Sequence, residues 1–379
     1  MCECTVFLID RTAQDQVGHH LQYNSFFSKA LRENSQNFFL INHTADISMG
    51  YQVDSGNFNL WAKKQDILRQ MEISTVIRIV EMNSITNFHV FFTWTRHFLT
   101  KDLQKWNEEL FGYNFSLEGL GPASNWVRKL PGWEKEFRHA YSFVSSSRKT
   151  RYLSWDRKLE DLGDSRFRQI PDFAAEVQNF SRRPLEERVI IGFFGPGTHD
   201  RGFSTFLLMA LLNPSVQFRF YGRTVNWNRL IYINLRFRRF SFVLSRALSV
   251  LMAPCFFTIS KLPNLQIAIT YPEMSILISK MQSCDAIFYE SKNRGESSGL
   301  VMHSLAAKVP VLYMGKDSQI IDWLDEHAPC GRIKFRDNFQ SGRLKKRVIQ
   351  LSTKDIPDTP SWEDFKGVFL SFRCQNTFE

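Results

Sequence analysis

Residues 284–315 read CDAIFYESKNRGESSGLVMHSLAAKVPVLYMG, and this stretch predicts the fold more directly than any other. The apolar run Ala286–Tyr289 is typical of a strand, and a polar loop follows it. A helix then opens at Ser297–Gly299, and a second strand covers Val309–Tyr313. A strand, a helix and another strand in this order predict a parallel α/β sheet.

The start of that helix predicts an anion site. Ser297, Ser298 and Gly299 are small, and the first backbone N–H groups of a helix have no acceptor within the helix. Together with the positive end of the helix dipole, such N–H groups bind a phosphate or a diphosphate. The carboxyl edge of a parallel sheet is where nucleotides usually bind. The alternative is an ordinary helix cap, because serine before an apolar run is common.

The same alternation continues on the N-terminal side of this stretch. The strands and helices that we expect in the second half are Val189–Phe194, Phe203–Leu212, Gln217–Tyr221, Leu265–Thr270 and Glu273–Gln282. At the start of the chain, strand Thr5–Asp10, a helix opened by Gly18 and strand Phe38–Asn42 predict a second unit of the same kind.

The middle of the first half is patterned less clearly. We expect strands at Thr75–Val80 and His89–Trp94, and a strand end at Phe143-Val144. Helical spacing is present at Lys101–Leu110 and at Trp133–Tyr141.

The length of 379 residues fits two domains, given about 100–200 residues per domain. The apolar rhythm breaks between Asp164 and Pro184, so we place the domain boundary there. The predicted fold is α/β, with two Rossmann-like doubly wound domains that face each other across a cleft. We expect the first domain at residues 1–170 and the second at 184–352, with a basic insert at 224–260. Residues 353–379 form a tail or helix that packs back on the first domain.

Positive charge is concentrated in one part of the chain. The net charge is +10, and the stretch from Arg201 to Pro272 contains no Asp or Glu. Its basic residues are Arg201, Arg219, Arg223, Arg229, Arg236, Arg238, Arg239, Arg246 and Lys261. Such a block indicates an anionic partner, which is membrane lipid, nucleic acid or a phosphorylated substrate. The alternative is a solvated face.

Within this block, Asn226–Phe257 alternates apolar residues with arginines. One interpretation is an interfacial helix on anionic lipid, and the other is a crossover helix of the second domain. The longest uncharged run, Ala247–Ser260, is too short to span a bilayer and contains Pro254.

The cysteines are scattered and lack the paired spacing of a zinc site. They are Cys2, Cys4, Cys255, Cys284, Cys330 and Cys374. No signal peptide precedes them, so we expect a reduced, cytoplasmic protein without a structural metal.

Four motifs in order resemble the GT-B glycosyltransferases, in particular the nucleotide-sugar-dependent enzymes of the family 4-like group, also called group 1. IIGFFGPGTHDRGF at 190–203 is similar to the group's first strand and phosphate loop, and the stretch at 284–315 is similar to its donor-nucleotide strand and helix. Ile170-Pro171-Asp172 resembles its interdomain entry. GHHLQYNSFFSKAL at 18–31 resembles its glycine-containing loop, which faces the acceptor and the donor sugar.

The sequence departs from the group at two places. Pro196 stands where many members have a basic residue after the strand-ending glycine. The two glutamates that many members carry eight positions apart fall on Gly295 and His303. The ribose contact, the donor sugar, the retaining or inverting outcome and an inactive copy of the fold are therefore left open.

The resemblance implies a donor site in the second domain. Arg201 is the candidate cation for the departing diphosphate, and Arg223 is a second cation. Ser297, Ser298 and Gly299 supply N–H groups at the helix start. The alternative for Arg201 is a surface arginine at a helix start.

Other candidates surround these groups. Glu290 and Glu296 contact ribose or sugar hydroxyls, or are solvated loop acids, and His303 lies on the donor helix. Because glycine allows close backbone approach, Gly18, Gly195 and Gly202 are assigned geometric roles.

On the acceptor side, His19 or His20 deprotonates an acceptor hydroxyl or hydrogen-bonds the sugar. The alternative is that the adjacent histidines are incidental. No convincing Asp-x-Asp metal motif is present, so we expect neither a metal ion nor a cofactor beside the nucleotide-sugar co-substrate.

The predicted function is transfer of a sugar from a nucleotide-sugar donor to a saccharide or lipid-linked acceptor. The family-level expectation is cell-surface polysaccharide synthesis in the cytoplasm, with the inner face of the membrane as an anionic partner surface. One alternative is a non-catalytic basic protein that binds lipid or nucleic acid through residues 224–260. The other is a GT-B nucleotide-sugar epimerase. For the transferase, nucleic acid is not an expected partner.

Overall fold

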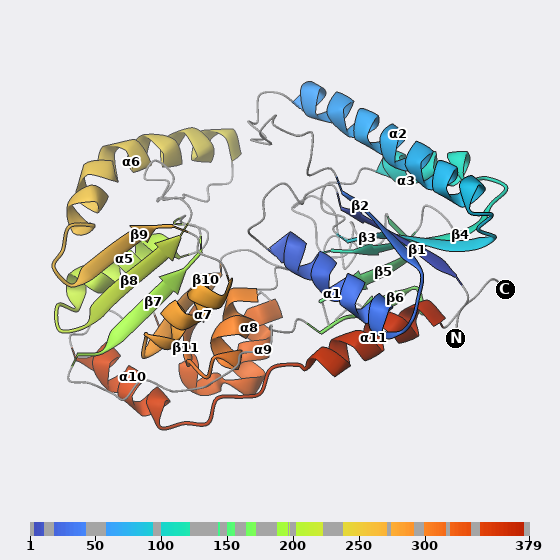
Figure 1. Cartoon of the computed structure of the whole chain (residues 1–379). Helices are drawn as coiled ribbons and strands as arrows, with labels where there is room; N and C mark the ends of the chain where they lie inside the picture. Colours follow the sequence, from blue (N-terminus) through green and yellow to red (C-terminus); the bar gives the residue numbers. More distant parts are fainter. Residues whose placement is uncertain are drawn as a thin grey trace. The chain divides into compact units, whose positions relative to one another are not determined.

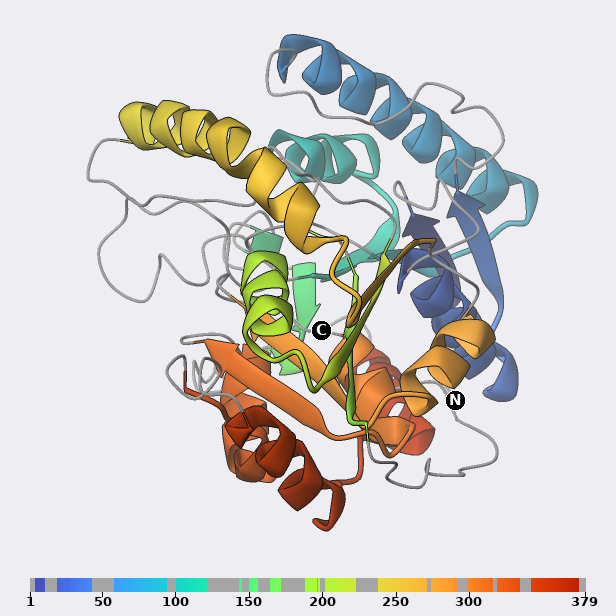
Figure 2. The same cartoon turned by 90° about the vertical axis from the view of Figure 1, so that its left-hand side faces the viewer.

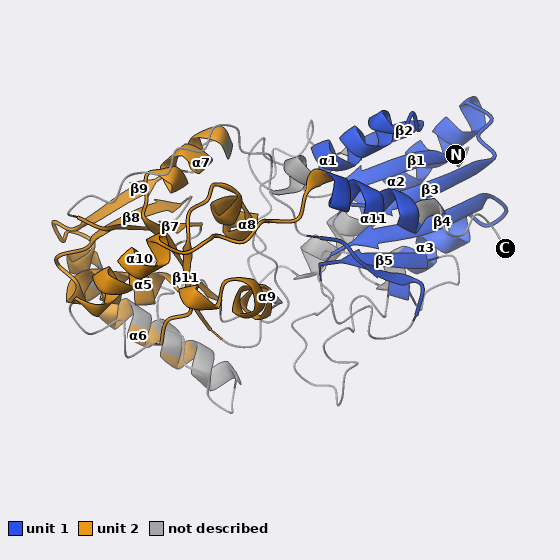
Figure 3. Cartoon of the chain, turned by 90° about the horizontal axis from the view of Figure 1, so that it is seen from below, with its two compact units in different colours: residues 1–171, 363–379 blue, residues 172–362 orange. Residues whose placement is uncertain are grey.

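The computed structural model describes fifteen parts of the chain and divides it into two compact units (Figures 1 and 3). Unit 1 is Met1–Pro171 with Glu363–Glu379, and unit 2 is Asp172–Trp362. The described residues are 4–10, 19–42, 58–93, 100–121, 143–144, 150–155, 164–171, 188–195, 197, 202–222, 238–270, 274–291, 299–315, 319–334 and 342–374.

Unit 1 contains a six-stranded parallel sheet in the order β2-β1-β3-β4-β5-β6. Its strands are β1 (Thr5–Asp10), β2 (Phe38–Asn42), β3 (Asn87–Phe92), β4 (Asn114–Leu120), β5 (Thr150–Ser154) and β6 (Phe167–Gln169). Its helices are α1 (His19–Glu33), α2 (Phe58–Met82), α3 (Thr100–Glu109) and α11 (Trp362–Cys374). The chain moves outward from β1 to β2 and then to the other side from β3 onward, which makes the sheet doubly wound.

Helices cover both faces of this sheet (Figures 1 and 2). One face packs on α2 and α3, where Val76 and Trp106 are fully buried against Phe88 and Phe92. The opposite face packs on α1 and α11. Two-sided burial explains why the inward positions of the strands are largely apolar.

α11 packs on the first sheet although it follows the second unit in the chain. The ring of Phe369 lies 4.7 Å from Phe27 on α1 and 5.3 Å from Phe91 on β3, measured between ring centroids. Phe365 lies 5.5 Å from Phe27. These aromatic contacts are the local reason why the end of the chain belongs to unit 1.

Two expectations for unit 1 were wrong. Thr75–Val80 lies inside α2 rather than in a strand, because Ile73, Val76 and Val80 are buried at helical spacing and this packing overrides the β preference of branched residues. Phe143 and Val144 lie in a helical segment, where they are buried against the sheet. Strands β4, β5 and β6 were not predicted, and the helix expected at Trp133–Tyr141 falls outside the described residues.

Unit 2 contains a five-stranded parallel sheet in the order β11-β10-β7-β8-β9. Its strands are β7 (Ile190–Phe194), β8 (Gln217–Gly222), β9 (Leu265–Ile269), β10 (Ala286–Ser291) and β11 (Val311–Gly315). Its helices are α5 (Phe203–Leu212), α6 (Arg238–Ile259), α7 (Met274–Gln282), α8 (Gly299–Ala306), α9 (Gln319–His327) and α10 (Arg343–Ser352), with a 3₁₀ turn at Pro329–Gly331. The predicted α/β class with two doubly wound parallel sheets is confirmed.

The core of unit 2 is rich in phenylalanine. On one face of the sheet, α5 and α10 cover strand residues that include Phe193, Phe220 and Phe288. On the other face, α7 and α8 cover Ile190 and Ile287, and α8 and α9 pack together at β11. Apolar residues fill the buried positions of these strands, in a continuous run in β7 and at alternate positions in β8, which is why the strands could be predicted from the sequence.

Residues 238–259 of the basic segment form a crossover helix between two strands of unit 2. α6 joins β8 to β9, packs beside α5 and carries Pro254 inside the helix. Its last residue, Ile259, is partly buried against the core. Within the described part of the chain, no helix has the length and apolar character needed to cross a membrane.

Candidate functional site

The candidate site lies at the carboxyl edge of the second sheet, between β7 and β10. β7 is the first strand of unit 2 in the chain, and it lies in the middle of the sheet. The chain proceeds from it to β8 and β9 on one side, and later to β10 and β11 on the other. The crevice at such a switch point is the usual ligand site of an open parallel sheet.

Two glycines bring the ends of β7 and β8 together. Gly195 directly follows β7, has φ +116° and donates its N–H to the carbonyl of Tyr221 at 3.0 Å. A Cβ on Gly222 would lie 2.1 Å from the carbonyl oxygen of Gly195. Because no side chain fits between these two backbones, glycine is required at position 222.

Gly202 sets the start of α5 against β10. Its φ of +83° is in the left-handed region, and its carbonyl accepts the N–H of Phe206 at 3.0 Å. A Cβ on Gly202 would lie 2.4 Å from the Cβ and 2.8 Å from the Oε2 of Glu290. Glu290 lies on β10 and is only 6% exposed. The absence of a side chain at 202 therefore lets the helix start approach a buried carboxyl group.

The start of α8 is close to the same place. Gly299 is the first residue of α8, and a Cβ on Gly195 would lie 3.2 Å from the Cδ1 of the next residue, Leu300. His303 lies one turn further along α8 and is 1% exposed. Ser304 donates its hydroxyl to the carbonyl of Val309 at 2.9 Å, which ties α8 to the turn before β11.

The helix starts at this edge favour an anion, and the carboxyl group of Glu290 is an acidic group that lies against the start of α5. The first turns of α5 and α8 contain no acidic residue, and Gly202 provides no side-chain cap. The N–H groups at each helix start have no intrahelical acceptor, and both helix dipoles place positive charge there. An arrangement of this kind can bind a phosphate group. Among the described residues, no group of three His, Cys, Asp or Glu side chains could hold a metal ion.

The structure brings four of the predicted residues together, namely Gly195, Gly202, Glu290 and Gly299. His303 lies on α8, and its side chain is buried. His19 and His20 form the first turn of α1 in the other unit, and only their backbone is described. The predicted residues outside the described part are Gly18, Arg201, Arg223, Glu296, Ser297 and Ser298. The roles assigned to all of these residues stay predictions.

The carboxyl edge of the first sheet has a polar contact that was not predicted. Asp10 ends β1, is 1% exposed and accepts a short hydrogen bond from Nδ2 of Asn24 on α1. Beside it, Thr93 donates its N–H to the carbonyl of Ile9 at 3.0 Å. This contact orients the helix that begins with the two histidines. The sequence signal for this contact was Asp10 itself, an acidic residue that ends an apolar strand.

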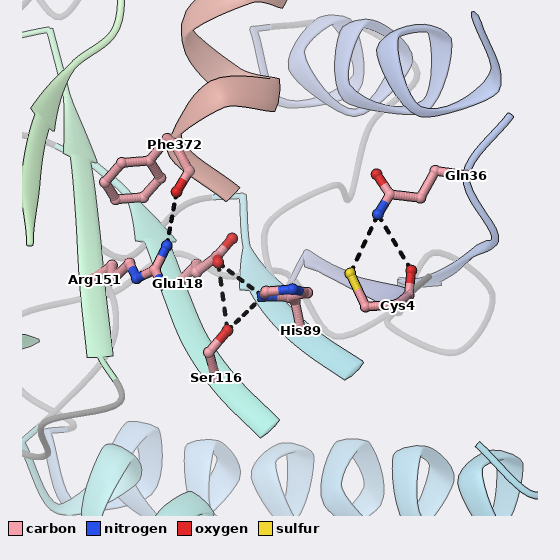
Figure 4. A network of polar contacts seen from close by, with 7 residues as sticks. All are labelled: Cys4, Gln36, His89, Ser116, Glu118, Arg151 and Phe372. Atoms are coloured by element: carbon pink, nitrogen blue, oxygen red, sulfur yellow. Dashed lines mark hydrogen bonds and ion pairs between the residues drawn. The ribbon is translucent and has the colours of Figure 1, made fainter. Parts of the chain in front are cut away.

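A buried polar network occupies the middle of the first sheet (Figure 4). His89 on β3 places Nδ1 2.5 Å from the hydroxyl of Ser116 and 2.9 Å from Oε1 of Glu118, both on β4. A catalytic relay uses both ring nitrogens, one for the base and one for the orienting acid, whereas these two contacts share one nitrogen. The network is therefore a structural bond between neighbouring strands.

Arg151 on β5 connects this region to α11. It is 8% exposed and donates from Nη1 to the carbonyl of Phe372 at 2.7 Å (Figure 4). Its guanidinium also lies 5.8 Å from the centre of the Phe372 ring. Next to the start of β1, Nε2 of Gln36 donates to the backbone carbonyl of Cys4 at 3.2 Å.

No protein-family model matches this sequence, and no curated protein matches it significantly. Solved structures do match its fold. One is described as "Trehalose-6-phosphate from E. coli bound with UDP-2-fluoro glucose", with a TM-score of 0.63, 8% identity and coverage of 98% of this chain and 99% of that one.

Two further matches have a similar extent. An α,α-trehalose-phosphate synthase (UDP-forming) from Burkholderia vietnamiensis has a TM-score of 0.58 at 9% identity, and covers 98% of this chain and 96% of its own. WaaG, a glycosyltransferase involved in lipopolysaccharide biosynthesis, has a TM-score of 0.52 at 11% identity, with 96% and 94% covered. The chain therefore has the GT-B fold, as the sequence motifs predicted.

Proposed function

We propose that this protein is a glycosyltransferase that moves a sugar from a nucleotide-sugar donor to a saccharide or lipid-linked acceptor. The observation that carries the proposal is the glycine-built edge at β7 and β10, where two helix starts meet on a GT-B fold. The matched glycosyltransferase structures support it, and one of them is described with UDP-2-fluoro glucose bound. Because their identity to this chain is low, the activity itself is the proposal.

In this proposal, unit 2 binds the donor through its diphosphate. The first N–H groups of α5 and α8 bind the phosphate oxygens, and Arg201 and Arg223 supply positive charge. As the sugar leaves, negative charge builds up on the diphosphate. Hydrogen-bond donors that already point at the diphosphate therefore lower the activation barrier of the transfer. Glu290 supports the start of α5, and Glu296 contacts sugar or ribose hydroxyls.

Unit 1 takes the acceptor in this proposal. His19 or His20, at the start of α1, removes the proton of the attacking hydroxyl, and the bond between Asp10 and Asn24 orients that helix. The description of WaaG as a lipopolysaccharide enzyme supports a place in cell-surface polysaccharide synthesis. A location on the cytoplasmic side is part of the proposal. Transfer without a divalent ion is part of the proposal, and product formation that is unchanged by EDTA would support it.

A thermal-shift screen with UDP, GDP, CMP, ADP and dTDP tests donor binding. A nucleotide at about a hundred times its dissociation constant should stabilise the fold by roughly 2.7 kcal/mol, which shifts the unfolding temperature by a few degrees. One nucleotide that stands out would identify the donor class. No shift with any of the five would contradict the proposal.

Gly202→Ala locates the site more sharply, with Gly342→Ala as its matched control. Both glycines precede a helix with φ values of +83° and +85°, so alanine costs about 1 kcal/mol of backbone strain at either position. Only Gly202 has Glu290 within reach of a Cβ, since nothing lies within 4 Å of a Cβ on Gly342.

We expect Gly202→Ala to weaken nucleotide binding by about tenfold or more, because the α5 N–H groups move away from the phosphates. Gly342→Ala should lose stability alone. Equal nucleotide affinity in the two variants, measured by calorimetry, would show that the donor does not bind at α5.

Arginine variants separate the donor site from the basic segment. Arg201→Ala should weaken nucleotide binding, whereas the double change Arg236→Ala with Arg238→Ala should leave it unchanged. The reverse pattern would place nucleotide binding on the basic segment and support the alternative of a non-catalytic basic protein.

A further inference from the structure

α6 presents a stripe of apolar side chains to solvent. Val243, Val250, Leu251 and Phe257 are 64%, 54%, 71% and 52% exposed. Ala247 and Pro254 are exposed between them. At 3.6 residues per turn, these six positions fall within about one third of the helix circumference, so they lie along one side of α6. Met252 and Cys255 are also exposed, outside that arc. We call these six residues the α6 stripe.

Such a stripe is unusual on a water-exposed helix. Single exposed apolar residues are common, whereas a contiguous apolar patch marks a surface that binds something. α6 is already held to unit 2, since it packs beside α5 and its last residue, Ile259, is partly buried against the core. The most exposed residues of the α6 stripe, Val243, Val250 and Leu251, can therefore contact a partner without disturbing the contacts that hold α6 to unit 2.

The charge around the α6 stripe indicates which partner it binds. Arg201 to Pro272 contains nine basic and no acidic residues, and Arg238, Arg239 and Arg246 belong to α6 itself. At the far end of the stripe, Nζ of Lys261 lies 4.6 Å from the centre of the Phe257 ring. Apolar side chains next to positive charges are the composition of helices that lie in the interface of an anionic bilayer.

We propose that α6 binds the surface of an anionic membrane. The α6 stripe enters the boundary between headgroups and acyl chains, and the neighbouring arginines and Lys261 contact lipid phosphates. A second copy of the chain would bring two strongly basic surfaces together. Nucleic acid would pair with the positive charges and leave the apolar stripe exposed. This inference does not depend on glycosyl transfer, so failure of the nucleotide screen would leave it standing.

The test is sedimentation of the full chain with vesicles. One set contains equal parts of phosphatidylglycerol and phosphatidylcholine, and the other contains phosphatidylcholine alone. We expect binding to the first set, with an affinity that falls as salt is added, because headgroup attraction is screened. Equal binding to both sets, or binding to neither, would overturn the proposal.

The double change Val250→Glu with Leu251→Glu should reduce binding to anionic vesicles by about tenfold or more. Its matched control is Met71→Glu with Met82→Glu on α2, where the side chains are 52% and 75% exposed. Both double changes add two negative charges to an exposed helix, so equal losses would show that net charge alone drives binding and would overturn the role of the stripe.

A milder variant keeps the proposal testable if the glutamates disturb folding. Arg238→Gln with Arg239→Gln leaves every apolar residue of the α6 stripe in place and should weaken binding to anionic vesicles, with an unchanged circular dichroism spectrum. Binding unaffected by this change would overturn the charge requirement. A parent chain that dimerises through the stripe, or binds random-sequence duplex DNA in place of vesicles, would also contradict it.

Discussion

The two sheets of this protein are both parallel and doubly wound, but they differ in strand order and in what fills them. In unit 1, His89 and Glu118 occupy inward positions of neighbouring strands and bond to each other. In unit 2, the corresponding region is filled by rings such as Phe193, Phe206 and Phe288. Aromatic packing is strong but not directional, whereas a buried hydrogen bond specifies its partner.

The carboxyl edges of the two sheets differ in the same way. The edge of unit 1 ends in the side-chain contact between Asp10 and Asn24, and the edge of unit 2 is built from glycines at 195, 202 and 222. A glycine edge lets strand ends and a helix start approach each other closely, and a polar edge offers side-chain groups that orient a helix. The comparison teaches that the two sheets form their carboxyl edges by different means, with a side-chain hydrogen bond in unit 1 and close backbone approach in unit 2.

The largest effect is expected in the aromatic interior. Phe206 is fully buried, and its ring lies 5.2 Å from Phe193 and 5.3 Å from Phe218. Phe206→Ala should cost about 4 kcal/mol of unfolding free energy in unit 2, because it leaves a cavity. Hydrogen exchange of β7 and β8 peptides measures this. Phe111→Ala, at an 88% exposed ring, is the control and should change little; similar losses in both variants would contradict the packing argument.

The buried polar network should be nearly as sensitive. Glu118→Leu keeps the volume but removes the acceptor of His89 Nδ1, so we expect a loss of about 3 kcal/mol in unit 1. Adding His89→Leu should recover part of this loss, because no buried imidazole then lacks its carboxylate. Protection of β3 and β4 amides reports both variants. If the double variant were less stable than Glu118→Leu, His89 and Glu118 would not depend on each other. The contrast between the polar interior of unit 1 and the aromatic interior of unit 2 would then be contradicted.

Arg151→Met tests whether a buried polar contact holds α11 to the first sheet. The buried hydrogen bond to the Phe372 carbonyl and the contact with its ring contribute about 2 kcal/mol together. Amide exchange in α11 should rise before exchange in β5. Lys366→Met removes solvent-screened ion pairs of the same helix with Glu33 and Glu363 and should change the stability little. A larger loss from Lys366→Met would show that surface charge, rather than Arg151, holds α11.

The smallest effect tests a polar contact within unit 2. Tyr313 is fully buried on β11 and donates its hydroxyl to Asp325 at 2.8 Å. Burial raises the pKa of Tyr313 to about 12. An unfolded tyrosine ionises near pH 10, so this stabilisation is complete below about pH 10 and is lost as the pH rises toward about 12.

Tyr313→Phe should cost about 1 kcal/mol at neutral pH, through the lost hydrogen bond, and should flatten the alkaline decline. Urea unfolding of unit 2 at a series of alkaline pH values measures both. The same decline in parent and variant would show that another group causes it.

Prediction from the sequence worked best in unit 2, where apolar residues fill the buried positions of the strands. The bounds of α5 were predicted to the residue, and those of β7, β8, β9 and β10 nearly so, because their apolar runs end at glycines and polar turns. β4 and β5 were missed, because Ser116, Glu118 and Arg151 interrupt the apolar pattern at positions that the fold buries. Nothing local in the sequence indicates that these polar residues meet partners on other elements.

The candidate site was predictable to the same extent. Gly195, Gly202 and Gly299 were identified from the sequence, because glycine at a strand end or a helix start indicates a backbone conformation that other residues rarely adopt. The contact of Gly202 with Glu290 arises only when β10 is placed beside β7, and no local pattern contains it. The bond of Asp10 to Asn24 was hidden for the same reason, since Asn24 looks like a surface residue of an amphipathic helix.

The position of α11 has a consequence for how the protein is made. A ribosome delivers every strand of the first sheet and then the whole second unit before it delivers α11. Until then, the aromatic face that includes Phe27 and Phe91 has no cover, and newly made chains with such faces aggregate or recruit chaperones. A chain shortened before Trp362 would keep all six strands of that sheet and still be a lasting chaperone client.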